Sequence, residues 1–214
     1  MRTVRIVLVA LLAVLSLSAA WGQTGKGATV SYLEGQVTID GTPASIGDAV
    51  PMGATVATGD QSLCEIVFGA KNAIRLAAAT TFVFNPGNLQ TGSSIAKGSI
   101  VLVLKQLSAL SAAATFTVRT PNAVAGVRGT SFFIDVLDPN TTYICSCNGS
   151  VHVEDPSGGS SKDMVASHHK ATLFTTGPSG VSAADATLLY HTDADVEAVA
   201  RDIGATIDWT TPGP

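Results

Sequence analysis

One stretch decides the fold that the sequence predicts: Arg119-Thr-Pro-Asn-Ala-Val-Ala-Gly-Val-Arg-Gly-Thr-Ser-Phe-Phe-Ile-Asp-Val136. Residues 115–119, which lead into it, alternate β-branched and aromatic residues, as a half-buried strand does. Pro121 has no amide hydrogen to give to a strand ladder, so pairing is expected to stop there or pass to an edge. Gly126 and Gly129 then indicate a bulge or a close backbone approach. The stretch therefore predicts a strand, a tight irregular connector and a second strand.

The remainder of the chain up to residue 174 has the composition of a strand-and-turn protein. It is rich in glycine, with 21 in the whole chain, and only 13% of residues are charged, which favours short strands joined by turns over helices. The pair Glu34-Gly35 lies between two strand-like runs and is a short hairpin signal. Further strands are expected over residues 62–68, 73–76, 81–84 and 98–104. The last of these is an almost continuous apolar run, as in a strand covered on both faces.

The deciding stretch resembles the hallmark of the FecR domain family, Thr-Pro-x-Ala-x-Ala-Gly-Val-Arg-Gly-Thr-x-Phe. Ten positions carry the residue that this pattern requires: Thr120, Pro121, Ala123, Ala125, Gly126, Val127, Arg128, Gly129, Thr130 and Phe132. Residues 47–59 resemble a second run of the family, Gly-Asp-x-Val-x-x-Gly-x-x-Val-x-Thr-Gly. The resemblance implies an all-β domain, an irregular β-helix or a double sheet, over residues 28–174. Periodicity alone would not distinguish it from a β-sandwich.

We expect the motif residues to be mainly structural. Arg128 could face a ligand, but an arginine between two glycines of a β core is more often held by backbone carbonyls or by an acid such as Asp135.

The N-terminus has the pattern of an export signal. Arg2 and Arg5 precede an apolar run over residues 6–20, and small residues at Ala20 and Gly22 predict cleavage before Gln23, which makes residues 1–22 a signal peptide. Ser18-Ala-Ala20 offers a second cleavage site. An uncleaved anchor is the alternative, although about 15 apolar residues is short against the ~20 that span a bilayer. No cysteine follows the run, so a lipoprotein anchor is not expected. The protein is therefore predicted to be periplasmic or secreted, without a membrane span after cleavage.

Charge and motifs exclude several classes of function. The net charge is −4 at pH 7, which disfavours binding to nucleic acid. The sequence contains no nucleophile elbow with a Ser-His-Asp grouping, no phosphate-cradling loop and no His-Glu-x-x-His motif. No enzymatic activity is therefore predicted.

A group of cysteines and histidines is the candidate site. Asn148-Gly149 is a strong hairpin signal, and a two-residue turn there would place Cys145, Cys147 and His152 on one face. A third strand could add His168 and His169 to that face. Two thiolates with one to three imidazoles suit zinc, copper or iron.

Other interpretations of the cysteines remain open at this stage. Cys145 and Cys147 could be core residues, form a strained and easily reduced disulfide, or act as a redox pair. Cys64 is expected to be a buried free thiol. The FecR pattern does not generally ask for a Cys-x-Cys pair, so the pair distinguishes this chain from its family.

Residues 175–214 are expected to form a linker and a small helical extension. Residues 175–180 have linker composition. Residues 183–190 and 193–203 have helix-like patterns, and Gly204 would end the second helix.

Together these features predict an exported, non-enzymatic FecR-like module that binds an envelope protein or glycan in sensing, with a link to iron-uptake signalling that the resemblance alone implies. Only five residues precede the apolar run, so the cytoplasmic sigma-factor-controlling arm of the best-known family members is not expected here. The alternative is a protein that binds a metal or a haem-type ligand through the cysteine and histidine cluster. A thiol redox protein is a third possibility.

Overall fold

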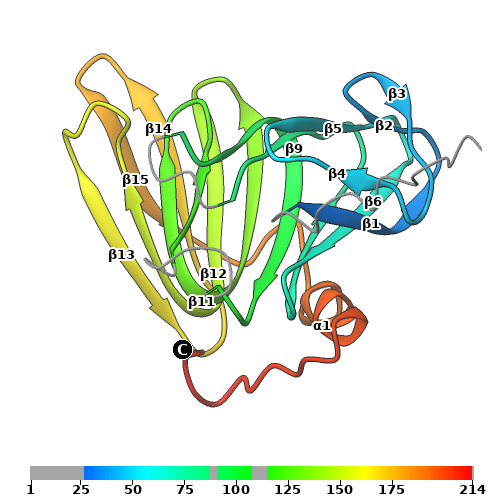
Figure 1. Ribbon diagram of the computed structural model, residues 1–214. Coiled ribbons are helices and arrows are strands. Elements are labelled where there is room, and N and C mark those ends of the chain that lie inside the picture. The colour runs from blue at the N-terminus through cyan, green and yellow to red at the C-terminus, as the bar shows by residue number, and fades with distance from the viewer. Residues whose placement is uncertain (1–26, 87–90, 108–114, 214) are drawn as a thin grey trace, which may run out of the picture.

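The computed structural model describes residues 27–86, 91–107 and 115–213. These residues form fifteen strands and one helix (Figure 1), which confirms the prediction of an all-β fold with a small helical extension. The proposed signal peptide, residues 1–22, lies outside the described residues. Within the described part of the chain, no helix is long and apolar enough to cross a membrane.

The elements are, in chain order, β1 (Ala28–Glu34), β2 (Val37–Ile39), β3 (Thr42–Pro43), β4 (Ala49–Val50), β5 (Ala54–Thr58), β6 (Leu63–Phe68), β7 (Asn72–Leu76), β8 (Thr81–Phe84), β9 (Ser93–Leu104), β10 (Phe116–Arg119), β11 (Val124–Asp138), β12 (Thr141–Glu154), β13 (Ser161–Ala166), β14 (Lys170–Gly177), β15 (Gly180–Ala186) and α1 (Asp193–Asp202).

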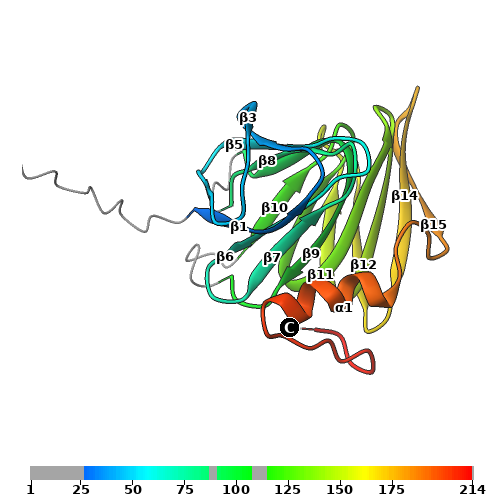
Figure 2. The ribbon, with the colours of Figure 1, turned by 90° about the vertical axis from the view of Figure 1, so that its right-hand side faces the viewer.

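All fifteen strands belong to one strongly curved sheet. Its main path runs β15-β14-β12-β11-β10-β9-β7-β6-β1-β4, and β2, β3, β5, β8 and β13 branch from this path. The long strands β9, β11 and β12 form the centre, while the short N-terminal strands fold over one end (Figure 1). Helix α1 lies across the lower ends of the central strands (Figure 2). The arrangement is therefore one branched sheet, in which β5 joins β2 to β8 and β8 joins the long strand β9.

The curved sheet separates two apolar clusters. Alternate residues of β9 face opposite ways, so Ile100 and Leu102 join the large interior core while Val101 and Val103 join a second cluster. This second cluster includes Val196 of α1 and is covered by α1 and the C-terminal tail. Both faces of β9 are therefore buried, as its continuous apolar run predicts.

The deciding stretch forms one tight turn and one long strand. Thr120 holds the turn, because its Oγ1 accepts a hydrogen bond of 2.9 Å from the backbone N–H of Ala123. From Val124 the chain is a continuous strand with a bulge between Arg128 and Ser131. The predicted order of strand, tight connector and second strand is confirmed as β10, the turn at residues 120–123 and β11. Strand β11 begins earlier than expected, at Val124, and contains the predicted bulge. Bulging lets the strand turn its direction without losing its ladder.

Arg128 does not pair with Asp135. Its side chain is exposed and lies opposite Ser150 of β12. Asp135 is seven residues further along β11, roughly 20 Å in an extended strand. Asp135 therefore cannot be the acid that holds this arginine.

The hairpin expected at Glu34-Gly35 is a β-arc. Strand β1 pairs with β6 and β4, whereas β2 pairs with β5 and β3. Gly35 has a φ of +73°, and a Cβ at this position would overlap the side chain of Ser62. A side chain at position 35 would therefore not fit against Ser62.

The hairpin expected at Asn148-Gly149 is also wrong. Strand β12 runs straight through this dipeptide and changes its partner there. It pairs with β14 as far as Ser146 and with β13 from Gly149 onward. The Asn148 amide, which would be exposed in a turn, instead donates to the backbone carbonyl of Ser167 at 2.9 Å.

Residues 175–213, the described part of the C-terminal extension, contain one helix and not the two that were expected. Residues 175–180 belong to the β14–β15 hairpin, and the first half of the segment expected as a first helix lies in strand β15, which pairs with β14. The second expected helix is confirmed as α1. Its N-cap is Thr192, which forms a capping box with Asp195.

Candidate functional site

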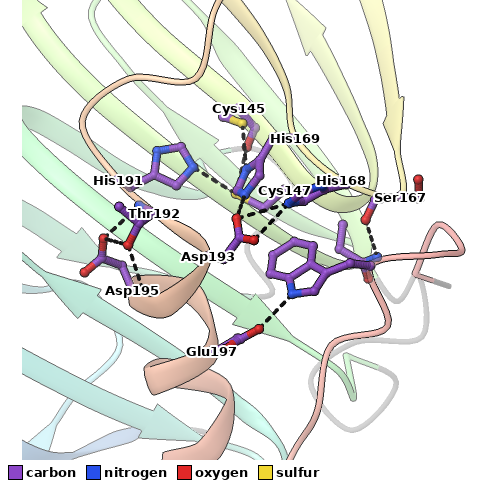
Figure 3. A network of polar contacts seen from close by, with 12 residues as sticks. Cys145, Cys147, Ser167, His168, His169, His191, Thr192, Asp193, Asp195 and Glu197 are labelled. Atoms are coloured by element: carbon purple, nitrogen blue, oxygen red, sulfur yellow. Dashed lines mark hydrogen bonds and ion pairs between the residues drawn. The ribbon is translucent and has the colours of Figure 1, made fainter.

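The candidate site lies where β12 changes partners, on the face of the sheet that α1 covers. Cys145 and Cys147 are two residues apart on β12, so their side chains share this face. Both are fully buried in the second apolar cluster. His169 from the β13–β14 connection and His191 from the segment before α1 point toward them (Figure 3).

His169 is held on three sides. Its backbone N–H donates to the carbonyl of Cys147 at 3.0 Å, which fills the gap between the partners of β12. Its Nδ1 lies 3.5 Å from Sγ of Cys145, and its Nε2 lies 2.8 Å from Oδ1 of Asp193. The residue has a φ of +45°, a left-handed conformation that is uncommon outside glycine.

His191 is fixed from the other side. Its Nδ1 lies 2.9 Å from the carbonyl oxygen of Leu189 and so donates its hydrogen there. Its Nε2 lies 3.3 Å from Sγ of Cys147. The ring stacks on Phe133, with centroids 4.2 Å apart and planes inclined by 16°. These contacts leave the ring little rotational freedom.

Tyr143 secures the segment that carries His191. Its hydroxyl donates to the carbonyl of Thr187 at 3.0 Å and accepts from the N–H of Leu189 at 3.0 Å. Tyr143 lies two residues before Cys145 on β12 and is fully buried. The strand that supplies the thiols therefore also anchors the segment that supplies His191.

A more exposed shell closes the site toward solvent. Asp193 accepts hydrogen bonds from His169 and from His168, whose Nε2 lies 3.0 Å from Oδ2 of Asp193. The Trp209 ring packs against both histidines, at centroid distances of 5.2 Å to His169 and 4.9 Å to His168. Its Nε1 donates to Glu197 of α1 at 2.8 Å. The tail is thereby tied to the helix over the site.

The two thiols differ in acidity. The pKa of Cys145 is lowered, chiefly because its sulfur accepts a hydrogen bond from Cys147, with further help from the two imidazoles. The pKa of Cys147 is raised, chiefly by burial and then by the neighbouring Cys145. The pair is therefore arranged to hold one negative charge readily on Cys145.

The sequence-based candidates separate into three groups. Cys145, Cys147 and His169 come together as predicted, and His168 lies one shell further out. His152 is elsewhere: it contacts Asp163 at 2.6 Å and Glu154 at 3.1 Å on the outer face. Its predicted place depended on the Asn148-Gly149 turn, which does not exist.

His191 is the ligand candidate that the sequence did not identify. Its only local signal is the adjacent acidic helix start, Asp193-Ala-Asp195, which a capping role already explains. Nothing in the spacing of His191 from the cysteines indicates that it would meet Cys147.

The cysteines form no disulfide, since all three are free. Cys64 is fully buried in the interior core, as expected. Burial, followed by the nearby charge of Glu65, raises the pKa of Cys64 to about 12. This thiol is therefore protonated and inert at neutral pH.

A separate groove lies on the outer face of the sheet. It encloses about 390 Å³ across β10, β11 and β12. Its lining combines charged and small side chains: Arg119, Arg128, His152, Glu154, Thr117, Gly126 and Ser150 are among them. Gly126 and Arg128 of the family motif therefore line this groove.

The comparison with protein families agrees with the resemblance in the sequence. Residues 54–152 match the family described as FecR protein. Two crystal structures of a candidate anti-sigma factor from Parabacteroides distasonis ATCC 8503, at 1.65 and 2.50 Å resolution, each show a TM-score of 0.48 and 15% identity to this chain. Each comparison covers 61% of this chain and 59% of the other, so this chain matches only part of that protein. Among curated proteins, none matches.

The family match includes the whole motif and both cysteines of the site, but it ends at residue 152, before His169 and His191. Residues 54–152 are therefore a FecR domain, as the motif predicted.

Proposed function

We propose that the protein is an exported, non-enzymatic module that binds a protein or glycan partner in the bacterial cell envelope and takes part in sensing. The observation that carries this proposal is the FecR domain at residues 54–152. Proteins of this family are regulators, which supports a signalling role and not a catalytic one. A link to iron-uptake signalling is the finer part of the proposal and follows from the family alone.

The groove on the outer face is where we place the partner. Arg119 and Arg128 contribute positive charge, and Glu154 contributes negative charge at the same groove. Its volume of about 390 Å³ falls within the ~300–1,000 Å³ of cavities that hold ligands or side-chain groups. A partner with exposed polar and charged groups of both signs would fit this lining.

The proposal that the protein is exported is based on residues 1–22. The basic start, the apolar run and the small residues before Gln23 form a signal peptide pattern. Fractionation of cells that express the full chain would test this part, together with N-terminal sequencing of the product. The expected result is a periplasmic or secreted protein that begins at Gln23. Retention in the cytoplasm would contradict the proposal.

Partner binding can be tested by site-specific photo-crosslinking in intact cells. A photoreactive residue replaces Ser150, which is exposed and lines the groove. The matched control places the same residue at Ile46, which is 63% exposed and does not line the groove. We expect one defined envelope product from position 150 and none from position 46. Equal crosslinking from both positions, or crosslinking from neither, would show that the groove is not the binding site for the partner.

A further inference from the structure

We propose that Cys145, Cys147, His169 and His191 bind a single zinc ion. None of these four residues lines the groove, and the assignment does not depend on the partner binding proposed above. Their four ligand atoms lie within 4.8 Å of one another. Two thiolates and two imidazoles are the donor set of structural zinc sites.

The distances between donors fit a tetrahedron around one ion. Zinc–sulfur and zinc–nitrogen bonds of about 2.3 and 2.05 Å place sulfur and nitrogen donors about 3.6 Å apart. Sγ of Cys145 lies 3.5 Å from Nδ1 of His169, and Sγ of Cys147 lies 3.3 Å from Nε2 of His191. Each thiol is therefore already at the spacing from its imidazole that a shared ion requires.

Each histidine directs one ring nitrogen at a thiol and the other at an outer partner. His191 uses its Nδ1–H for the carbonyl of Leu189, which leaves the Nε2 lone pair directed at Cys147. His169 places its Nε2 against Asp193 and its Nδ1 against Cys145, so a metal ion bound at the thiols would take the Nδ1 lone pair in place of a proton. Metal-bound histidines have this kind of outer partner, a carboxylate or a backbone carbonyl, on the second nitrogen.

The backbone around the site is held in uncommon conformations. His169 has a φ of +45° and Tyr190, next to His191, has a φ of +66°. Such conformations of residues other than glycine persist where the surrounding structure enforces them, and they gather at ligand sites. Here they direct the two imidazoles at the thiols from opposite sides.

Burial and charge favour zinc over the other ligands considered. Two thiolates neutralise one Zn²⁺, so the filled site carries no net charge among buried apolar side chains. An iron–sulfur cluster with two cysteines and two histidines places the two kinds of ligand on different irons, whereas here each sulfur is paired closely with a nitrogen. Haem iron takes its protein ligands at axial positions, whereas here four donor atoms converge within 4.8 Å of one another. A haem-type ligand is therefore disfavoured.

A second group of donors overlaps the site and provides the rival assignment. His168, His169 and Asp193 also lie within reach of one another. The side chains of His168 and Asp193 are 50% and 44% exposed, and the three donors are already satisfied by hydrogen bonds among themselves. We therefore assign these contacts to the outer shell of the cysteine site.

Zinc in this position would join the FecR domain to the segments that follow it. The thiols lie on β12 within the matched residues, while His169 and His191 come from beyond residue 152. One ion would thus fasten the β13–β14 connection and the start of α1 to the central strand.

Metal content and cobalt spectroscopy test the proposal. The full-length chain is expressed and purified under reducing conditions without chelators, whether or not the proposed signal peptide is cleaved. We expect one zinc per chain. After removal of the metal, Co²⁺ should give the visible bands of a tetrahedral site and a thiolate-to-cobalt charge-transfer band. Loss of an outer-shell partner weakens metal binding by about 10–100-fold. The cysteines would contact the ion directly, so Cys145→Ser and Cys147→Ser should each weaken zinc binding by more than about 100-fold.

The controls separate the alternatives. Cys64→Ala removes a thiol elsewhere in the core and should leave zinc affinity unchanged. Asp193→Asn alters a partly exposed outer residue, so it should fold normally and still weaken binding by about 10-fold or more. Zinc binding that survives both cysteine changes but is lost in His168→Gln would assign the ion to the rival group and overturn the proposal. A reduced wild-type chain that binds no zinc and gives no charge-transfer band would also overturn it, as would stoichiometric copper or iron in place of zinc.

Discussion

Sγ of Cys147 lies 3.3 Å from Nε2 of His191, although 44 residues separate them in the chain. Cys147 belongs to a central strand, whereas His191 lies in the segment that leads into α1. In the unfolded chain the two groups would be far apart and only rarely meet. An ion bound by both would therefore favour the folded state over the unfolded one.

Zinc is accordingly expected to raise the stability of the protein. At a free concentration about 100-fold above its dissociation constant, a ligand of the folded state adds about 2.7 kcal/mol. For a chain of this size that corresponds to a rise in Tm of about 5–10 °C. Thermal unfolding followed by circular dichroism, with and without a chelator, measures the effect. Cys64→Ala should respond as the wild type does, and an equal response of Cys147→Ser would contradict this explanation.

Gly149→Ala should destabilise the fold even though Gly149 contacts no ligand. Gly149 has a φ of +127°, and a Cβ there would lie 2.8 Å from Oγ1 of Thr130. Conformational strain and this overlap should cost about 1–3 kcal/mol. Gly126→Ala is the matched control from the same sheet, because the nearest atom would be 3.9 Å away. It should change the free energy of unfolding by less than about 0.5 kcal/mol. Urea denaturation measures both, and equal effects would refute the argument.

Thr120→Val tests the structural role of the family motif. The Thr120 hydroxyl accepts from the N–H of Ala123 at 2.9 Å and from the hydroxyl of Thr142 at 3.1 Å, in a buried turn. Valine has the same shape but leaves the N–H of Ala123 without this acceptor, at a cost of about 1–3 kcal/mol. Thr120→Ser retains the hydroxyl and should keep most of the stability. If the two variants unfold at the same urea concentration, the hydroxyl does not hold the turn.

His152 should titrate above its ordinary range. Its hydrogen bond to Asp163 is the main cause of the raised pKa, and Glu154 adds to it. The protonated form therefore stabilises the fold below about pH 6.5, the pKa of an unperturbed histidine, and this contribution is lost as the pH rises through the folded-state pKa. The side chain is 45% exposed, so the effect on stability is small.

An NMR titration of the His152 imidazole measures this pKa directly. Asp163→Asn should lower it toward the ordinary value, whereas Glu154→Gln should lower it less. A pKa that does not respond to Asp163→Asn would show that this contact is absent in solution.

The strands were predictable where one face is buried in a regular alternation. Residues 62–68 and 98–104 show the periodicity of β6 and β9, and the family motif indicates the bulge near Gly129. The hairpins expected at Glu34-Gly35 and Asn148-Gly149 were wrong because a glycine with positive φ occurs in two different settings. Positive φ at Gly35 and Gly149 allows a tight hairpin, but it also allows a close approach to Ser62 or Thr130. Ser62 and Thr130 each lie more than ten positions from the glycine that they approach. The local sequence therefore does not distinguish a hairpin turn from a close approach.

The candidate site was half predictable for the same reason. Cys145 and Cys147 share a face in any extended strand, so their pairing follows from spacing alone. His191 joins them only because Tyr143 anchors residues 187–189 and Phe133 stacks on the ring. These are contacts between distant segments, and periodicity carries no information on them.

The two ends of the main path of the sheet differ in how readily another chain could extend them. At one end, β4 is two residues long and is followed by Pro51, features that block the addition of a strand. At the other end, β15 has seven residues and, within the described part of the chain, pairs with β14 alone. Its outward backbone groups are therefore open to a strand from elsewhere. Self-association or fibril growth of this protein, where it occurs, should begin at β15, and the charge of Asp185 on that strand is a natural deterrent.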